Sequence, residues 1–99
     1  MNFNQKCYEQ LKKVPKGKVT TYKALAEALG TKAYRAVGNA MNKNANAPVI
    51  PCHRVVGSDG QLTGYAFGLD KKINLLKQEG IEIQNNKVVN LEKYLFSGF

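Results

Sequence analysis

Residues 20–43, TTYKALAEALGTKAYRAVGNAMNK, predict two short helices joined by a glycine turn. The first helix is expected over about residues 21–29, because apolar side chains recur there at the i, i+3, i+4, i+7 spacing of one helical face. These side chains are Tyr22, Leu25, Ala26 and Leu29. Thr20 or Thr21 can cap the start of this helix, and Gly30 can end it, since glycine readily adopts the left-handed conformation of a helix end.

A second helix is expected over about residues 32–43, with Thr31 as its cap. Its inner face consists of small or apolar side chains, namely Ala33, Ala36, Val37, Ala40 and Met41. Its outer face is rich in hydrogen-bond donors and has no acid: Lys32, Arg35, Asn39, Asn42 and Lys43. Two short helices joined by a tight glycine turn are typical of a helix-turn-helix, whose second helix contacts DNA. A merely solvated polar face is the alternative, and the absence of acids argues against it.

Positive charge is concentrated in the same part of the chain. The net charge is +8, and residues 1–52 hold nine Lys and Arg against two Glu, whereas residues 53–99 hold six against five acids. No carboxylate lies between Glu27 and Asp59. A basic surface without acids suits a polyanion, because neutralised phosphates release their condensed counterions. The charge therefore indicates double-stranded DNA as a partner, with a generally basic protein as the alternative.

The flanking segments complete one small domain. An amphipathic helix is expected over residues 4–14, with Cys7 in the core, and Pro15 after it. Asp59-Gly60 between two apolar pairs, Val55-Val56 and Gln61-Leu62, predicts a hairpin that would be the wing of a winged helix.

The last third of the chain is expected to add a helix and a small hairpin. Asp70 should cap a fourth helix that ends at Glu79-Gly80, and residues 81–89 should form a hairpin around Asn85-Asn86. A short amphipathic segment, Leu91 to Phe96, should pack on the core. The fold class is thus α/β, mostly α: a winged helix-turn-helix DNA-binding domain with small hairpins.

Length and composition favour a single intracellular domain. The chain has 99 residues, of which 43% are hydrophobic, and no apolar run long enough for a membrane span. Two cysteines, Cys7 and Cys52, suit a reducing compartment, and the N-terminus lacks a secretory pattern. We therefore expect a monomer in the cytoplasm, or in the nucleus if the source is eukaryotic.

The segment with the most chemistry is Pro51-Cys52-His53-Arg54-Val55. Cysteine reacts as the thiolate, and its ordinary pKa of about 8.5 leaves only a few per cent ionised at neutral pH, so a neighbouring base or cation matters. His53 is the single histidine, and Arg54 adds positive charge. A buried cysteine beside a hydrogen-bonded histidine is the alternative for the dipeptide alone. One histidine and two distant cysteines do not make a zinc set, so no metal is expected.

The chain resembles the O6-alkylguanine-DNA alkyltransferases, also called methylated-DNA–protein-cysteine methyltransferases. The resemblance runs from about Phe3 to Tyr94 and rests on these segments in order: Arg35-Ala36-Val37-Gly38, Asn44, Pro51-Cys52-His53-Arg54-Val55, Gly64-Tyr65 and Gly68-Leu69. It implies one domain over residues 1–99, with a helix-turn-helix at about 20–43, an active-site segment at 49–56, a wing at about 55–63 and a pocket loop at 63–69.

The resemblance implies that the protein repairs DNA by transferring an alkyl group from O6 of a flipped guanine to Cys52. Each molecule would act once, without metal or organic cofactor. The implied catalytic residues are Cys52, His53, Glu79, Tyr22 and Asn44. In the family, the residue matching Glu79 holds the matching histidine as a base that acts on the cysteine, here Cys52, through a water. The tyrosine that matches Tyr22 helps rotate the nucleotide and donates to the leaving guanine.

The resemblance also implies a minor-groove interface and a base pocket. The implied DNA-binding residues are Arg35, Tyr22, Lys32, Ala33, Asn39 and Lys43. Arg35 would fill the hole left by the flipped base, which suits a guanidinium that stacks and hydrogen-bonds. The implied pocket residues are Tyr65, Ala66, Phe67 and Val55. Some members have a serine and a glycine where Ala66 and Phe67 stand, so the range of alkyl groups stays open.

Two other functions remain possible from the sequence. Alkyltransferase-like proteins share this compact form, bind lesions without repairing them and mark them for other repair proteins; they usually have tryptophan or alanine at the position of Cys52. A winged-helix regulator without chemistry is the second, and it leaves the Pro51–Val55 motif and Glu79 unexplained. The family's full-length members carry a further N-terminal α/β domain, for which this chain has no room, so the catalytic half alone is expected.

Overall fold

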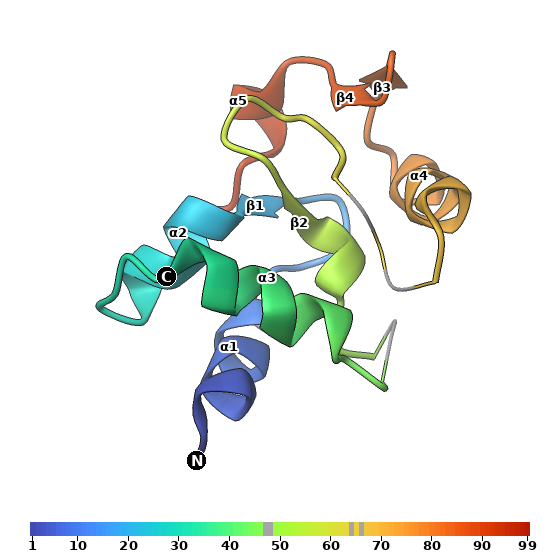
Figure 1. Ribbon diagram of the computed structural model, residues 1–99. Coiled ribbons are helices and arrows are strands. Elements are labelled where there is room, and N and C mark those ends of the chain that lie inside the picture. The colour runs from blue at the N-terminus through green and yellow to red at the C-terminus, as the bar shows by residue number, and fades with distance from the viewer. Residues whose placement is uncertain (47–48, 64, 66) are drawn as a thin grey trace.

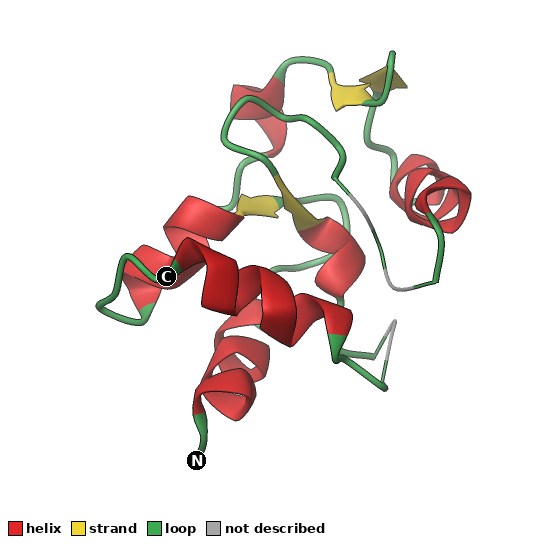
Figure 2. Ribbon diagram, in the orientation of Figure 1, coloured by secondary structure: helices red, strands yellow, loops and turns green. Residues whose placement is uncertain are grey.

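The computed structural model describes residues 1–46, 49–63, 65 and 67–99. Its elements, in chain order, are α1 (Phe3–Leu11), β1 (Thr20–Thr21), α2 (Tyr22–Ala28), α3 (Tyr34–Asn42), the 3-10 helix η1 (Cys52–Arg54), β2 (Val55–Val56), α4 (Leu69–Gln78), β3 (Ile83–Gln84), β4 (Lys87–Val88) and α5 (Leu91–Tyr94). Helices predominate and the strands are short (Figure 2). The mostly helical fold with small strands that the sequence predicts is confirmed.

The helices α1, α2 and α3 pack on one another, while α4 stands apart beside η1 (Figure 1). The strands β1 and β2 lie between these two groups, and the hairpin of β3 and β4 lies with α5 at the far side of the molecule (Figure 1). The segment that holds Cys52 therefore joins the two groups of helices. None of the described helices is long and apolar enough to cross a membrane.

Local sequence signals set the helix ends, with some differences from the expected limits. The helix α1 starts at a capping box in which Asn2 Oδ1 accepts from Gln5 N at 2.8 Å and Gln5 Oε1 accepts from Asn2 N at 3.0 Å. It ends at Leu11 rather than Val14, because proline at the next position, Pro15, disfavours helical backbone at Val14. Cys7 is fully buried, as predicted.

The two central helices form the predicted pair, with a later start for the second. Thr21 Oγ1 accepts from Ala24 N at 3.0 Å and so caps α2, as expected. Thr31 does not cap α3; its hydroxyl accepts from Ala33 N at 3.1 Å within the turn, and α3 starts at Tyr34. Ala33 is consequently exposed and belongs to the turn instead of the inner face. The rest of the inner face is buried at Val37, Ala40 and Met41, with Ala36 half-buried.

The predicted hairpin of the wing is wrong. Val55 and Val56 pair in parallel with Thr20 and Thr21, not with Gln61-Leu62. The turn at residues 57–61 is closed by Gly57 N donating to Gln61 O at 2.9 Å. Residues 60–62 then bond to the C-terminal hairpin, with Leu62 N donating to Asn86 O at 2.8 Å. The hydrogen bonds expected across a wing are therefore divided between β1 and the C-terminal hairpin.

The C-terminal third follows the prediction except at the start of α4. Gly68, at a φ of 100°, precedes α4, and Asp70 lies in the first turn without capping it. The strands β3 and β4 form the predicted antiparallel hairpin, and both turn residues, Asn85 and Asn86, have positive φ, as a type I′ turn requires. Leu91–Tyr94 is the helical turn α5, and Val19 forms a bridge with Leu95 just after it.

Two groups of buried side chains meet at β2. We call the first the helical core: Cys7, Leu11, Val14, Leu25, Ala26, Val37, Ala40, Met41, Ile50, Cys52 and Val55. We call the second the hairpin core: Val19, Val56, Leu62, Leu76, Ile81 and Val88. Adjacent residues of β2, Val55 and Val56, belong to different cores because successive side chains of a strand point to opposite faces. The Cys52 turn is thus anchored from both sides.

Candidate active site and nucleic-acid interface

Cys52 lies in a tight turn at the edge of the helical core. Pro51 precedes η1, Cys52 N donates to Ile50 O at 2.8 Å, and Arg54 N donates to Pro51 O at 2.9 Å. The Cys52 side chain is 3% exposed. Pro51 and Ile50 are buried, but Val49 is 81% exposed, so the buried extended segment expected here does not include Val49. The proline and these two bonds fix the direction of the thiol.

The charge state of Cys52 depends on residues from three distant segments. Burial raises the pKa of the Cys52 thiol, because a thiolate loses hydration in the protein interior. The Asn44 amide, the Lys72 ammonium and the Tyr65 hydroxyl act in the opposite direction. The adjacent His53 and Arg54 are not among the groups that lower this pKa, contrary to the sequence-based hypothesis.

Asn44 holds the loop after α3 against the Cys52 segment. Its Nδ2 donates to Ile50 O at 2.8 Å, and its Oδ1 accepts from Asn46 N at 2.9 Å. The side chain is buried, and every one of these bonds is short in sequence. This is the local bonding expected for an asparagine at a hinge; its part in a reaction stays a prediction.

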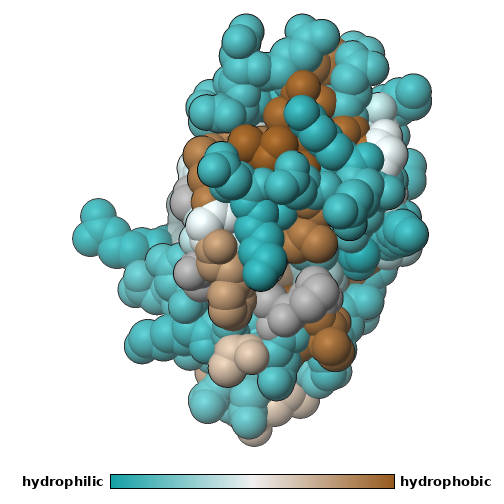
Figure 3. Space-filling view, turned by 90° about the vertical axis from the view of Figure 1, so that its right-hand side faces the viewer, coloured by the Kyte–Doolittle hydropathy of each residue, from teal (hydrophilic) through white to brown (hydrophobic). Residues whose placement is uncertain are grey.

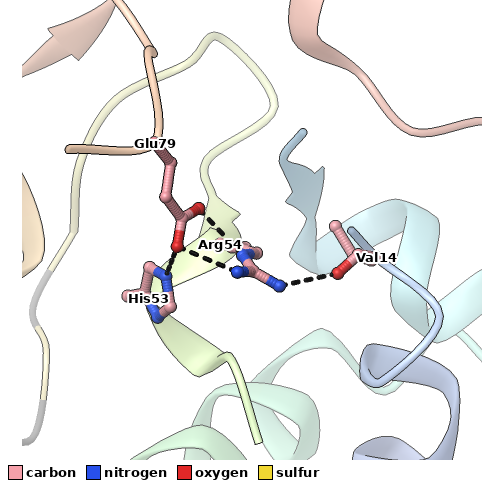
Figure 4. A network of polar contacts seen from close by, with 4 residues as sticks. All are labelled: Val14, His53, Arg54 and Glu79. Carbon is pink, nitrogen blue, oxygen red and sulfur yellow. Dashed lines mark hydrogen bonds and ion pairs between the residues drawn. The ribbon is translucent and has the colours of Figure 1, made fainter. Parts of the chain in front are cut away.

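His53, Glu79 and Arg54 form one buried network (Figure 4). His53 Nε2 lies 2.8 Å from Glu79 Oε2. Arg54 holds both oxygens of the same carboxylate, with Nε donating to Oε1 and Nη2 to Oε2, each at 2.9 Å. Arg54 Nη1 also donates to Val14 O at 2.9 Å, which fixes the guanidinium to the segment after α1. Arg54 therefore orients Glu79, a function that its place beside Cys52 in the sequence did not reveal.

The network favours a neutral imidazole beside an ionised carboxylate. Burial lowers the pKa of His53, although Glu79 acts against this. Burial alone would raise the pKa of Glu79, but hydrogen bonds from Arg54 and His53 outweigh it and hold this pKa below its ordinary value. With the ring neutral and Nε2 donating to Glu79, Nδ1 is the acceptor atom. His53 Nδ1 is buried and has no hydrogen-bond partner among the described residues.

Lys72 is a buried residue that the sequence reasoning missed. Its side chain is 1% exposed, and Nζ donates to Val55 O at 2.8 Å and to Thr63 O at 3.3 Å. Burial lowers the pKa of Lys72 to about 8, and the charge of Cys52 acts to raise it. A signal was present in the sequence, because Lys72 stands four residues before Leu76 on the inner face of the predicted helix.

Aromatic residues of the expected pocket loop lie close to Cys52. Tyr65 packs against the helical core, and its ring centroid is 5.4 Å from that of Phe67. Burial and the nearby Cys52 raise the pKa of Tyr65 to about 12. Ala66 lies outside the described residues. Val55 differs from the expectation, since its side chain is fully buried by the pairing of β2 with β1 and only its carbonyl is turned to the loop, through Lys72.

Tyr22 connects the helix-turn-helix to this loop. It is the first residue of α2 and half-buried against the helical core, and its hydroxyl lies 2.9 Å from Thr63 Oγ1. Burial is the main cause that raises the pKa of Tyr22, so the hydroxyl keeps its proton. The core and surface interpretations of this tyrosine are therefore compatible.

The expected nucleic-acid face is exposed along α3 and the turn before it. Its members are Lys32, Ala33, Arg35, Asn39, Asn42 and Lys43. Tyr34, which the sequence reasoning passed over, is 41% exposed beside Arg35. Seen from the side on which α4 lies, the surface is largely hydrophilic with smaller hydrophobic patches (Figure 3). Within the described ranges, no group of three or more His, Cys, Asp or Glu side chains could hold a metal ion.

The sequence matches the family model described as "6-O-methylguanine DNA methyltransferase, DNA binding domain" over residues 2–81. A bifunctional methyltransferase/endonuclease of Picrophilus torridus is 46% identical over 93 residues, covering 93% of this chain and 31% of that protein. A methylated-DNA–protein-cysteine methyltransferase of Methanosarcina barkeri is 53% identical over 79 residues, covering 79% of this chain and 50% of that protein. The chain thus spans about half or less of the length of these curated relatives.

Solved structures show the same fold. Mycobacterium tuberculosis OGT in complex with DNA has a TM-score of 0.77 and 40% identity, over 80% of this chain and 50% of that chain. S. pombe Atl1 in complex with damaged DNA containing O6-carboxymethylguanine has a TM-score of 0.84 and 29% identity, over 96% of this chain and 94% of that chain. The two neighbours differ in how much of their own length this chain covers.

Proposed function

This chain belongs to the O6-methylguanine DNA methyltransferase family, and from that premise we propose that it repairs duplex DNA by moving an alkyl group from guanine O6 to Cys52. The family that the sequence motifs indicated is confirmed by the match over residues 2–81. Relatives named methylated-DNA–protein-cysteine methyltransferases support DNA repair by alkyl transfer. The activity, the substrate and the partner remain our proposals for this chain, which spans only part of those relatives.

The buried network around His53 is the observation that carries this proposal. Glu79 holds Nε2 of a neutral ring, which leaves Nδ1 as a proton acceptor one residue away from a buried thiol. Nucleophile, base and orienting acid is the arrangement that activates a weak nucleophile in other enzymes. We infer that His53 takes the Cys52 proton through one water molecule, because the two side chains belong to adjacent residues of one tight turn.

The proposed reaction is a direct displacement. The Cys52 thiolate attacks the alkyl carbon, a carbon–sulfur bond forms, and the bond from that carbon to guanine O6 breaks. The electron pair stays with the guanine, which then takes a proton, and Tyr22 is our proposed donor because its raised pKa keeps the hydroxyl protonated. The thioether does not release the alkyl group, so each molecule acts once. The step needs no metal or organic cofactor.

The proposed interface places α3 in the minor groove. This groove offers little sequence information, which suits a protein that searches for damage in any sequence. Arg35, exposed at the start of α3, would enter the duplex while the guanine rotates out toward Tyr65. Lys32 and Lys43 would contact phosphates on either side. DNA complexes of the neighbouring structures support DNA as the partner.

The direct test is intact mass and peptide mapping after mixing the protein with a duplex that holds one O6-methylguanine. We expect one methyl group on the Cys52 peptide and restored guanine in the DNA. Cys7→Ala is the matched control, since Cys7 is fully buried in the helical core, and it should still transfer. Cys52→Ala should lose transfer and keep lesion binding; loss of both would remove Cys52 from its assigned role.

The second candidate is a lesion-binding protein without transfer. The likeness to S. pombe Atl1 favours it, because the match covers nearly the full length of both chains. Cys52 and the His53–Glu79 pair favour transfer instead. In the same experiment, tight binding of the O6-methylguanine duplex with no change in protein mass would support the binding protein and reject the repair reaction.

A further inference from the structure

Lys72 is a buried cation that the proposed reaction does not employ. Its ammonium group is held by two backbone carbonyls, and no carboxylate among the described residues forms an ion pair with it. Burying an ammonium ion without an acid is unfavourable, because the ion loses its hydration. An apolar side chain would fill the same place on α4 without that cost. The positive charge itself therefore needs an explanation.

The two carbonyls that Lys72 binds belong to the two segments that frame Cys52. Val55 is the first residue of β2, directly after the turn that holds the thiol. Thr63 begins the loop that carries Tyr65, and its hydroxyl bonds to Tyr22. The ammonium thus ties the Cys52 segment, the loop and α4 together at one point. Loss of this tie would release Thr63 and, with it, the Tyr22 hydroxyl.

Lys72 also interacts electrostatically with the thiol. The positive charge of Lys72 lowers the pKa of Cys52, and the negative charge of the thiolate raises the pKa of Lys72. Each charge therefore stabilises the other. The titratable groups that respond to either charge come from every neighbouring segment: Tyr8 on α1, Tyr22 on α2, His53 on η1 and Tyr65 in the loop.

We propose that Lys72 is a positioning residue for the transfer reaction, which stabilises the Cys52 thiolate with its charge and fixes the Tyr65 loop against β2 with its two hydrogen bonds. This inference rests on the proposed function, since it assigns a role in that reaction. It adds a second source of activation to His53. In this arrangement His53 removes the proton, and Lys72 holds the charge that remains on the sulfur.

The test is the pH dependence of Cys52 labelling by iodoacetamide, followed by peptide mapping in the absence of DNA. Lys72→Met removes the charge and keeps the length of the side chain. We expect the midpoint of labelling to move upward by about one pH unit, as for a thiolate that loses a nearby cation. Lys72→Arg should restore part of the shift, because it keeps the charge. Lys71→Met, an exposed neighbour on α4, is the control and should label as the wild type does.

An unchanged midpoint in a folded Lys72→Met protein would overturn the electrostatic role. The labelling uses no DNA, so it still decides this point if the wild type fails to transfer a methyl group; that failure would instead reject the proposed function. Single-turnover transfer from the O6-methylguanine duplex gives the second measurement. We expect at least a tenfold slower rate for Lys72→Met and less than a twofold change for Lys71→Met, as one unit of thiolate pKa changes ionisation by about tenfold.

A measurement on the wild type covers the case in which Lys72→Met does not fold. The pKa of the Lys72 ammonium can be followed by heteronuclear NMR in the wild type and in Cys52→Ala. We expect the pKa to fall in Cys52→Ala, because the negative partner is gone. The same pKa in both proteins would show that Lys72 and Cys52 do not interact, and the inference would be wrong.

Discussion

The outer face of α3 and the buried end of α4 use charge in opposite ways. Arg35 and Lys43 point to solvent in a stretch without acids, where salt screens them and a polyanion can reach them. Lys72 and Glu79 point inward, where water is excluded and each charge changes the protonation of a neighbour. The comparison teaches that the same residue types support binding on one helix and reactivity on the other. The following predictions test that division.

The largest effect is expected at the buried end of α4. Glu79→Gln would leave Arg54 and His53 without their carboxylate, so the free energy of unfolding should fall by about 3 kcal/mol, as when one partner of a buried pair is removed. Methyl transfer should slow by roughly 100-fold or more, because the base is no longer oriented. Urea denaturation and single-turnover kinetics measure the two effects.

Glu82→Gln is the matched control for Glu79→Gln. Glu82 is exposed three residues later, so both stability and transfer should stay near the wild-type values. DNA binding should be retained in both variants, since neither residue belongs to the face of α3. Normal transfer by a folded Glu79→Gln protein would show that His53 does not act as the base.

The next effect concerns stability at alkaline pH. The pKa of Lys72 is about 8 in the folded protein and 10.5 ordinarily, so the unfolded chain binds its proton more tightly. Lys72 therefore opposes folding below about pH 8, and this penalty disappears as the pH rises to 10.5. The free energy of unfolding of the wild type, relative to Lys72→Met, should rise by up to about 3 kcal/mol across that window.

Chemical denaturation at several pH values measures this difference. The tyrosines near Cys52 titrate in the same range, but they are present in both proteins and largely cancel in the comparison. A difference that stays constant from pH 8 to 10.5 would mean that Lys72 is not buried as a cation.

A smaller effect is expected when the α3 face loses its inserting side chain. Arg35→Ala should slow methyl transfer from duplex DNA by about tenfold, since stacking of a side chain on a base contributes ~1–3 kcal/mol. Overall affinity for undamaged duplex should change much less. Fluorescence anisotropy and single-turnover transfer separate the two. An equal loss of affinity and of transfer would count against insertion of Arg35 into the duplex.

The smallest effect is expected at single phosphate contacts. Lys32→Ala and Lys43→Ala should each reduce the slope of log affinity against log salt by about 0.9, the value for one phosphate contact. Damaged and undamaged duplexes should be affected alike, because such contacts do not distinguish the base. Lys71→Ala, exposed on α4, should leave the slope unchanged. A change at Lys71 equal to that at Lys32 would place DNA over α4 as well.

Local signals accounted for most of what the sequence predicted correctly. Thr21 caps α2, and Val37 and Ala40 are buried on α3, because capping and helical periodicity depend only on residues within one or two turns. The pairing of β3 with β4 follows from two asparagines in the turn. The capping box of Asn2 and Gln5 is a local signal of the same kind, and it was overlooked.

The errors concern interactions between distant segments. The wing was wrong because Val55 pairs with Thr20, and a turn signal at residues 57–60 does not show which strand the preceding residues join. Arg54 was interpreted as a charge next to Cys52, whereas its partner is Glu79, 25 residues further along the chain. Lys72 was missed because its acceptors, Val55 and Thr63, lie 17 and 9 residues away. Chemistry at the site thus depends on contacts that periodicity does not encode.

The distance along the chain between His53 and its acid also has a consequence during protein synthesis. Glu79 follows His53 by 26 residues, which a ribosome adds in on the order of one to five seconds at roughly 5–20 residues per second. Lys72 is likewise added after the Cys52 turn. For that interval, the growing chain carries an ordinary thiol, with neither an oriented imidazole nor a buried cation beside it. Reactivity therefore arises only with the folded product, and an unfinished chain does not spend its single cysteine.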